Sequence, residues 1–590
     1  MQKLVIQNVQ AGRDLNIFVD GRASGGVSAK FQLPPAPELF GRQDLIADLI
    51  TRMRLQAYRK GLLVYGMPGV GKTSLLINLG HKLRETHSDA QIFVSFAGTE
   101  KGRRKALTAA DAMRKVIRSF HPTVEIPEDE DQLNAAYRSV LTEAGNVLLV
   151  FDDVVGPEQI SGLVPPSNCA WILSSRSRIT LLELESQELG CLDWNASVEM
   201  LQSLAPPIGE LASTVANYCA GLPLALQFFS AQLRKQPLIP AGDLAREFQA
   251  AVATVGPVAA SIRLSYDRLS VRLQLRLSLL AVFARDFQLS AAQVVWELDE
   301  ATTRDELQSL LDSNLVQFDR ELERFALHEF VRAFLNSEHP NWVLHRARIF
   351  HAHYFARVCD LIGAFVIRDG SEKLTGLRLF DQERSEIEAA FNFIREEKAK
   401  HYAKTMADLG RIAGLVGHLR FSSDEQIEWL MAARSAAKRA RSDDRYIDAT
   451  GNLANAFIRR NEYEKARPYA MELLQFGRRH RDRTREGNAL TCLALIEKHS
   501  GHPQRAIELL RDRMAIARET GDRGAIVRAL NNLANAYDDL NELDEQMRCL
   551  REALALAESQ GEIIDRASTM NNLGMALLKQ GLAGRFRFTS

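Results

Sequence analysis

A glycine-rich segment, "YGMPGVGKTSLL" from Tyr65 to Leu76, combines residue types that can hold phosphate. Its glycines permit a tight loop whose backbone N–H groups converge on phosphate oxygens at the start of a helix. Lys72 would reach the β- and γ-phosphates of a nucleotide, and the Thr73 hydroxyl would bind Mg²⁺. The predicted phosphate-site residues are Gly66, Gly69, Gly71, Lys72, Thr73 and Ser74.

Two carboxylates and a guanidinium follow later apolar runs. "NVLLVFDDV" ends in Asp152 and Asp153, and "AWILSSRSR" leads to Arg176. At the carboxyl edge of a parallel sheet, Asp152 is placed to hold Mg²⁺, directly or through water. Asp153 could orient or deprotonate an attacking water, and Arg176 could sense a γ-phosphate. Each signal is common in isolation, but after a phosphate loop they predict a single site.

A sheet whose strands end at one edge must position these residues. Leu62 to Tyr65 form an apolar run short enough for a buried parallel strand, and a helical pattern follows the loop. The runs before Asp152 and Arg176 have the same apolar character. We therefore predict an α/β nucleotide-binding domain.

The bulk composition describes a large, neutral chain. Its 590 residues exceed what one core can organise, so several domains are expected. Lys+Arg and Asp+Glu both number 74, which leaves no net field to attract nucleic acid or an anionic membrane. No apolar run approaches the roughly 18 residues of a membrane span, and the start lacks a signal peptide's apolar stretch. Six scattered cysteines suit a reduced interior, so we predict a cytoplasmic protein with no membrane partner.

The order of the motifs resembles the NB-ARC branch of the STAND ATPases, a class of signalling proteins. "LFGRQD", Leu39 to Asp44, is similar to the motif that lies against the adenine in that family, which implies an adenine contact for Arg42. The family usually has Glu where Gln43 stands. "SSRSR" resembles its sensor strand, with Arg176 in the arginine's place. Over residues 36–336 the resemblance implies ATP or ADP, with Mg²⁺, as the cofactors.

Two further motifs extend the resemblance. "CAGLPLAL" matches the GLPL motif, in which Pro223 would pack on the adenine; a proline here also predicts that a helix begins at this point. "FALHEFVRAF" resembles the MHD motif, which implies that His328 contacts the β-phosphate of ADP. Leu327 and Glu329 replace the usual Met and Asp. A histidine on an apolar segment is more often a core residue, so only the resemblance assigns His328 to the site.

Residues 257–336 alternate short amphipathic helices with a strand pair, which suits the winged-helix domain of the family. Winged helices often bind DNA. The candidate recognition helix, Arg304 to Asn314, has one basic and three acidic residues, whereas a groove reader should be basic. We therefore predict a structural role for this domain and no direct DNA binding.

The C-terminal half repeats itself every 40 residues, at Leu453, Leu493, Leu533 and Leu573. The best copy resembles a tetratricopeptide repeat and predicts stacked helix pairs with a concave groove. At the helix crossing, Gln546 stands where earlier copies have Ala466 and Ala506, which predicts a looser crossing. The basic run from Gly477 to Glu486 falls between repeats and predicts a solvated loop.

Asparagines recur on the first helix of the repeats. They could face the groove and bond the backbone of a bound peptide, or they could simply space and end helices; both readings stay open. The four residues are Asn452, Asn455, Asn532 and Asn535.

These patterns together predict a multidomain chain with an α/β P-loop NTPase domain, a helical domain, a winged-helix domain and an all-α TPR-like solenoid. The first 33 residues hold two short alternating stretches, too few for a catalytic output domain. The expected divisions are a recruitment segment (1–33, mostly β or disordered), a nucleotide domain (34–190), a helical domain with the GLPL motif (191–256), a winged helix (257–336), a helical bridge (337–440) and repeats whose last copy is incomplete (441–590).

The family logic predicts a slow ATPase that acts as a switch. ADP would hold a closed state, and a protein or peptide ligand on the repeats would favour exchange for ATP, homo-oligomer formation and recruitment of an effector in trans. Two alternatives stay open, a winged-helix transcriptional regulator and a passive repeat scaffold with structural ADP. Defence and gene regulation are equally compatible with the family, and the ligand, effector and oligomer number are not encoded in recognisable motifs.

Overall fold

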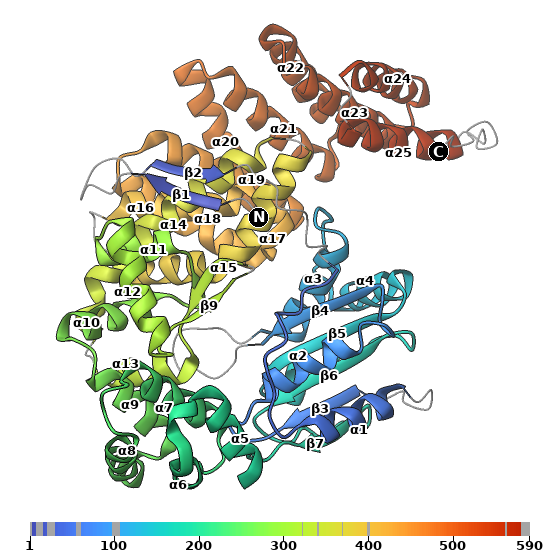
Figure 1. The fold of residues 1–590 in the computed structure, drawn as a ribbon. Helices are drawn as coiled ribbons and strands as arrows, with labels where there is room; N and C mark the ends of the chain where they lie inside the picture. Colours follow the sequence, from blue (N-terminus) through green and yellow to red (C-terminus); the bar gives the residue numbers. More distant parts are fainter. Residues whose placement is uncertain are drawn as a thin grey trace. The chain divides into compact units, whose positions relative to one another are not determined.

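The structure is a computed structural model, and it divides the chain into two compact units, Met1–Phe393 and Ile394–Ser590. The described strands all belong to the first unit, whereas the second is helical (Figure 1). Among the described residues, none of the helices combines the length and apolarity that a bilayer crossing requires. The described residues are 3–7, 16–20, 30–54, 61–96, 107–320, 322–338, 341–368, 370–397, 402–560 and 563–579.

A five-stranded parallel sheet organises the nucleotide domain, in the order β4-β5-β6-β3-β7. The central strands are almost wholly buried, as expected for uninterrupted apolar runs covered on both faces. Because all five strands are parallel, their carboxyl ends meet at one edge of the sheet. The strands are β3 (Gly61–Tyr65), β4 (Ala90–Ser95), β5 (Val147–Val154), β6 (Ala170–Ser175) and β7 (Leu184–Glu188).

Side-chain alternation along the strands divides the core of this domain into two layers. On one face Leu62 and Val64 pack with residues of α1 and α2. On the other face Leu63 and Phe151 pack with residues of α3 and α4. The covering helices are α1 (Gln43–Arg54), α2 (Lys72–Lys82), α3 (Ala109–Phe120) and α4 (Glu130–Ala144).

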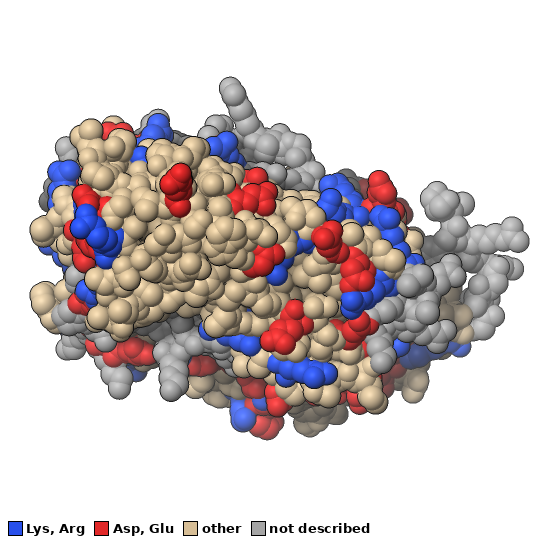
Figure 2. Space-filling view, turned by 60° about the horizontal axis from the view of Figure 1, so that its bottom comes forward, with Lys and Arg blue, Asp and Glu red and all other residues tan. Residues whose placement is uncertain are grey.

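A small helical domain follows, with its own apolar core. Pro223 occupies the first turn of its helix α7, so the prediction that a helix begins at the GLPL motif is confirmed. Residues 211–233 and 248–262 contain no charged residue. Figure 2 brings this side of the molecule forward, and its left part shows few Lys, Arg, Asp or Glu side chains. The helices are α5 (Trp194–Leu204), α6 (Ala212–Tyr218), α7 (Pro223–Lys235) and α8 (Ala241–Val255).

The next segment combines five helices with a three-stranded antiparallel sheet in the order β8-β10-β9. The sequence predicted only a strand pair. Phe287 of β8 pairs with Phe325 of β10, which in turn pairs with Phe318 of β9. The elements are α9 (Pro257–Asp267), α10 (Val271–Leu279), β8 (Asp286–Phe287), α11 (Leu289–Trp296), α12 (Glu300–Asp312), β9 (Gln317–Asp319), β10 (Arg324–Ala326) and α13 (Glu329–Glu338).

Two long helices, α14 (His345–Val366) and α15 (Ser371–Glu397), pack on this small sheet through buried charges. Arg324 donates to both carboxylate oxygens of Glu383, at 2.5 and 3.0 Å. Glu386 accepts the backbone N–H of Ala284 at 2.9 Å and bonds His351 Nε2 at 2.9 Å. Removing one partner of such a buried set is strongly destabilising, so these contacts hold the sheet and the helix pair together.

The second unit is a series of antiparallel helix pairs from α16 to α25. The four leucines at 40-residue spacing lie on alternate helices and are all buried, at most 5% exposed. The TPR-like solenoid predicted from that spacing is confirmed, and so is the parallel α/β domain before it. The helices are α16 (Ala403–Leu415), α17 (Gly417–Arg420), α18 (Ser423–Arg439), α19 (Asp443–Arg459), α20 (Tyr463–His480), α21 (Arg483–His499), α22 (Pro503–Thr520), α23 (Arg523–Asp539), α24 (Leu543–Gln560) and α25 (Ile563–Lys579).

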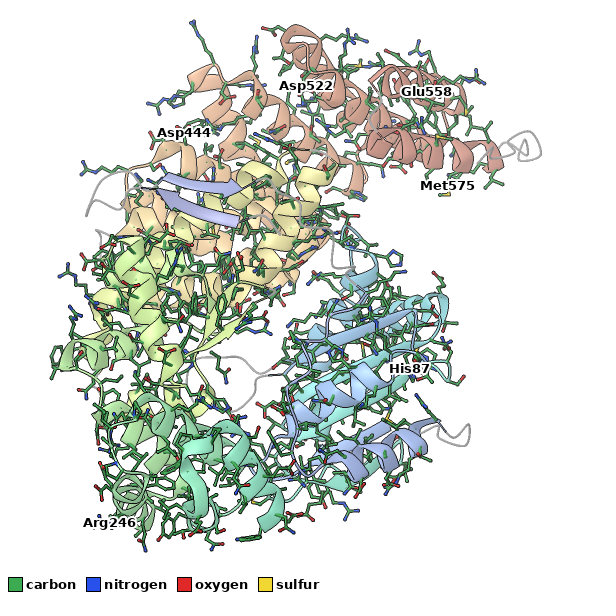
Figure 3. All side chains as sticks on the ribbon, in the orientation of Figure 1. His87, Arg246, Asp444, Asp522, Glu558 and Met575 are labelled. Carbon is green, nitrogen blue, oxygen red and sulfur yellow. The ribbon has the colours of Figure 1, made fainter. Side chains whose placement is uncertain are left out.

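The basic run at Gly477 to Glu486 is not the solvated loop that the sequence predicted. Only Arg481 and Asp482 lie between α20 and α21. Arg485 donates to Asp448 of the preceding repeat at 3.0 Å, so a basic residue of the run serves contacts between repeats. The prediction was wrong because two residues are enough to connect the helices: Asp482 caps α21, so no longer loop is needed. Asp522, which is labelled in Figure 3, caps α23 in the same way, because it accepts the N–H of Ala525.

The N-terminal segment contains two short strands, β1 (Lys3–Gln7) and β2 (Asn16–Asp20), which pair antiparallel. The register places Lys3 opposite Asp20 and Gln7 opposite Asn16. The rest of the predicted recruitment segment, up to residue 29, lies outside the described residues.

Candidate nucleotide-binding site

The phosphate loop joins β3 to α2 in a conformation that requires glycine. Gly69 and Gly71 have φ values of 81° and 95°. Gly71 is the N-cap residue of α2 and offers no side-chain cap to the helix. At Gly66 a Cβ atom would lie 2.3 Å from the carbonyl oxygen of Leu189, so a side chain would clash. The free N–H groups at the start of α2 therefore remain available to an anion.

Lys72 is folded over this loop. Its Nζ donates to the carbonyl oxygens of Gly66 at 2.9 Å and Met67 at 3.1 Å. Burial lowers the pKa of Lys72, and the neighbouring charge of Arg176 lowers it further. The carbonyl groups of these two loop residues thus hold the ammonium group over the phosphate loop, where it could contact a bound phosphate.

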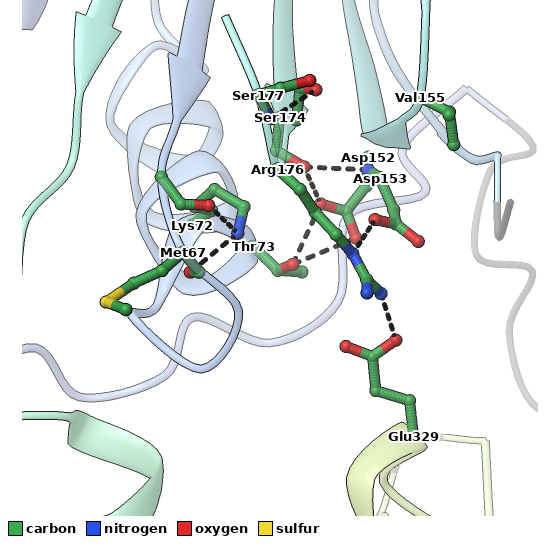
Figure 4. A network of polar contacts seen from close by, with 12 residues as sticks. Met67, Lys72, Thr73, Asp152, Asp153, Val155, Ser174, Arg176, Ser177 and Glu329 are labelled. Atoms are coloured by element: carbon green, nitrogen blue, oxygen red, sulfur yellow. Dashed lines mark hydrogen bonds and ion pairs between the residues drawn. The ribbon is translucent and has the colours of Figure 1, made fainter. Parts of the chain in front are cut away.

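Asp152 receives hydrogen bonds from two hydroxyl groups. Thr73 Oγ1 donates to its Oδ1 at 2.9 Å and its Oδ2 at 3.1 Å, and Ser174 Oγ donates to Oδ1 at 2.5 Å (Figure 4). Burial raises the pKa of Asp152, although both hydrogen bonds favour the ionised form. A hydroxyl and a carboxylate side by side are the oxygen donors that Mg²⁺ takes from P-loop proteins, so the residues fit that ion. Among the described residues no group of three or more His, Cys, Asp or Glu could hold a metal alone.

Asp153 lies in a bulge of β5. Phe151 pairs with Leu173 and Val154 with Ser175, which leaves Asp152 and Asp153 opposite a single residue of β6. Asp153 has a φ of 57°, a left-handed conformation that aspartate tolerates better than most residues. The sequence predicted both carboxylates at the carboxyl end of β5, but it did not predict the bulge in which they lie.

Arg176 connects the nucleotide domain with the start of α13. Its Nε donates to Asp153 Oδ1 at 3.3 Å, and its Nη2 donates to Glu329 Oε2 at 2.6 Å (Figure 4). Burial raises the pKa of Glu329, whereas Arg176 lowers it. Glu329 was not among the predicted site residues; the only sequence signal was that it replaces the usual Asp of the MHD motif.

His328 precedes this contact and is held as a neutral ring. Its Nδ1 accepts the backbone N–H of Phe330 at 3.3 Å, so the ring proton resides on Nε2. Burial lowers the pKa of His328 from 6.5 to about 4. A neutral ring that carries its proton on Nε2 is a hydrogen-bond donor of the kind a phosphate oxygen accepts.

The predicted adenine side also joins the loop. Arg42 Nη2 donates to the carbonyl oxygen of Gly190 at 2.5 Å, and the preceding Leu189 donates its N–H to Tyr65 O at 2.7 Å. Leu224, which follows Pro223 in α7, donates its N–H to Gly69 O at 3.4 Å. Ser74 lies in the first turn of α2. The structure thus places Arg42 against the segment that follows β7, whose Leu189 bonds the end of β3, and Pro223 next to a residue that bonds the phosphate loop.

Comparison with known proteins identifies two family models in the chain. Residues 42–203 match the family model of the NB-ARC domain, and residues 526–559 match that of a tetratricopeptide repeat. The chain therefore combines an NB-ARC domain, a P-loop domain that binds nucleotide, with C-terminal tetratricopeptide repeats, as the sequence predicted.

Its relatives are distant and longer. An alignment of 578 positions, which covers 90% of this chain, shows 24% identity to the regulatory protein AfsR of Streptomyces griseus. An alignment of 565 positions shows 24% identity to AfsR of Streptomyces coelicolor. The chain spans 58% and 55% of the lengths of these proteins. The disease resistance protein SUMM2 of Arabidopsis thaliana is also 24% identical to this chain, over an alignment of 267 positions. That alignment covers 40% of this chain and 28% of SUMM2.

Among solved structures, a STAND protein with a tetratricopeptide repeat sensor from Pyrococcus horikoshii is similar to this chain with a TM-score of 0.46 and 13% identity. The similarity covers 93% of this chain and 88% of that one.

Proposed function

We propose that the protein is a cytoplasmic signalling switch that is closed when it binds ADP and opens when ATP replaces it. The observation that carries the proposal is the position of Arg176 between Asp153 of the nucleotide domain and Glu329 of α13. A γ-phosphate would offer Arg176 another anion and so compete with Glu329. The same guanidinium can therefore report the third phosphate and release α13.

The other site residues have complementary roles in this proposal. The N–H groups of the phosphate loop and Lys72 bind the β- and γ-phosphates, while Thr73 and Asp152 hold Mg²⁺, which neutralises phosphate charge when bound. His328 donates its Nε2–H to the β-phosphate in the closed state. Asp153 orients the water that hydrolyses ATP, and we expect this hydrolysis to be slow. Arg42 and Pro223 contact the adenine.

The remainder of the chain supplies input and output. The tetratricopeptide repeats bind a protein or peptide ligand in their groove. That ligand shifts the equilibrium only if it binds the open form more tightly than the closed form. The open form self-associates and recruits an effector through residues 1–33, in a pathway of defence or of gene regulation. The segment 257–336 acts as the winged-helix domain that closes on the nucleotide.

The test is to identify the nucleotide that co-purifies with the protein and to measure particle mass with ADP and with a non-hydrolysable ATP analogue. We expect ADP in the purified protein and a larger particle with the analogue once ligand is supplied. Lys72→Ala and Asp152→Ala should remove the difference. Stable ADP, with no exchange and no change of mass, would favour a passive repeat scaffold instead.

A second candidate function is transcriptional regulation, because two relatives are named regulatory proteins. The helix that would have to enter the DNA groove, α12, argues against direct DNA contact. Arg304 is paired with Glu300 at 2.6 Å, and the buried Glu306 is paired with Arg276, so α12 presents no basic face. A salt-dependent mobility shift with specific DNA would revive this alternative.

A further inference from the structure

Ser174 connects the two acidic residues of the nucleotide site. It lies in β6, is 1% exposed, and was not among the residues that the sequence assigned to the site. Its hydroxyl donates to Asp152 Oδ1 at 2.5 Å and accepts the backbone N–H of Asp153 at 2.8 Å. A hydroxyl carries one proton, and the N–H of Asp153 can only donate, so the proton of Ser174 is directed to Asp152.

The bulge in β5 explains why a side chain is needed here. Asp153 leaves the regular pairing of β5 with β6, because Phe151 pairs with Leu173 and Val154 pairs with Ser175, the residues on either side of Ser174. A backbone N–H that loses its partner in the protein interior costs free energy comparable to a lost hydrogen bond. The hydroxyl of Ser174 takes the place of the missing strand partner of Asp153, and the same hydroxyl donates to the carboxylate of Asp152.

Among the hydrogen bonds of the described residues, the one from Ser174 alone distinguishes the two oxygens of Asp152. Thr73 Oγ1 lies 2.9 Å from Oδ1 and 3.1 Å from Oδ2, so its contact does not select one of the two oxygens. Ser174 bonds Oδ1 alone. We propose that Ser174 is a positioning residue for the Mg²⁺–nucleotide complex. By binding Oδ1 and holding the bulge, it leaves Oδ2 of Asp152 as the oxygen available to the metal.

This inference rests on the proposed nucleotide site, and its test separates the two. The affinity for a fluorescent ADP analogue is measured with Mg²⁺ and with EDTA in wild type and in Ser174→Ala. The gain in affinity that Mg²⁺ gives to the wild type should fall about 10-fold or more in Ser174→Ala, because losing the partner of a metal-binding side chain has effects of that size. The affinity in EDTA should stay near the wild-type value, because Lys72 and the loop are untouched.

Ser175→Ala is the matched control. Ser175 is the next residue of β6, is fully buried, and its Oγ accepts the N–H of Ser177 at 3.3 Å. It should keep the full Mg²⁺ gain. If Ser174→Ala does not fold, Ser174→Thr and Ser174→Val provide a pair of equal size that differs by the hydroxyl, and only the threonine variant should respond to Mg²⁺.

Four outcomes would contradict the inference. An unchanged Mg²⁺ gain in Ser174→Ala, or equal gains in the threonine and valine variants, would overturn the role of Ser174 and leave the proposed function intact. An equal loss in Ser175→Ala would reduce the effect to general damage of β6. A wild type that gains nothing from Mg²⁺ would overturn the proposed metal site together with this inference.

Discussion

Arg176 lies between two carboxylates that come from distant parts of the sequence. Its ion pair with Glu329 is partly exposed, with side-chain exposures of 33% and 45%. Pairs of this kind contribute between roughly 0.2 and 1 kcal/mol. A free energy of this size is too small to hold α13 against the nucleotide domain by itself. It is small enough for a phosphate that binds Arg176 to displace Glu329. At the residue scale the contact is therefore better suited to a switch than to permanent support.

The backbone of Asp153 makes a prediction about stability. In the left-handed region with φ of 57°, the Cβ of any residue costs about 1–2 kcal/mol; the short polar side chains of aspartate and asparagine can offset this cost by local hydrogen bonds, whereas alanine cannot. Asp153→Ala should therefore unfold at lower temperature than Asp153→Asn in thermal denaturation of the full chain with no nucleotide. Equal melting temperatures of the two variants would show that the conformation at this position is not strained.

His328 predicts a pH dependence. Its folded pKa of about 4 lies below the ordinary value of 6.5, so the unfolded chain binds more protons between these limits. The stability associated with His328 should be complete above pH 6.5 and decline as the pH falls toward 4. Comparing wild type with His328→Gln isolates this effect: the difference in free energy of unfolding should change across that window. A difference that is constant with pH, or that grows as the pH falls, would contradict it.

At the scale of elements, α13 is the part of the chain that the nucleotide site can release. Glu329→Gln weakens the contact with Arg176, so the closed state should lose up to about 1 kcal/mol. We expect a fluorescent ADP analogue to dissociate up to about five-fold faster, as followed by stopped-flow displacement. Glu338→Gln is the control, because Glu338 lies at the other end of α13 and pairs with Arg263 outside the site. Equal rates in wild type and Glu329→Gln would remove Glu329 from the mechanism.

The helix crossing in the repeat formed by α23 and α24 predicts a stabilising substitution. Gln546 is 6% exposed and its Oε1 has no hydrogen-bond partner, whereas the equivalent Ala466 and Ala506 are fully buried. Replacing an unsatisfied buried polar group by alanine should stabilise this repeat by about 1 kcal/mol. Amide hydrogen exchange within α23 and α24 should be slower in Gln546→Ala than in wild type. Faster exchange would show that the glutamine side chain is needed to fill the crossing.

The sequence allowed elements to be predicted better than contacts between them. Apolar runs and glycine spacing were enough for β3, the phosphate loop and α2, and a 40-residue spacing was enough for the solenoid. Ser174 and Glu329 were missed as site residues because their roles depend on the bulge in β5 and on the packing of α13, neither of which leaves a local pattern. The inter-helix turn at Arg481 was also missed, because charge alone does not distinguish a loop from exposed helix ends.

At the scale of the whole molecule, the site gathers residues from segments far apart in the sequence. The phosphate loop, the ends of β5 and β6, the start of α7 and the start of α13 are joined by hydrogen bonds within the first unit. A ligand bound among these segments contacts parts of the chain that the proposed opening would separate. Such a ligand can favour one arrangement only through a difference in affinity between the two.

The most direct test of this account is hydrogen exchange in residues 322–338 of protein loaded with ADP or with a non-hydrolysable ATP analogue. The account predicts faster exchange at the start of α13 with the analogue, because the third phosphate takes Arg176 from Glu329. In Arg176→Ala the two nucleotides should give the same exchange. Identical exchange with both nucleotides in the wild type would contradict the claim that this pocket reads the γ-phosphate.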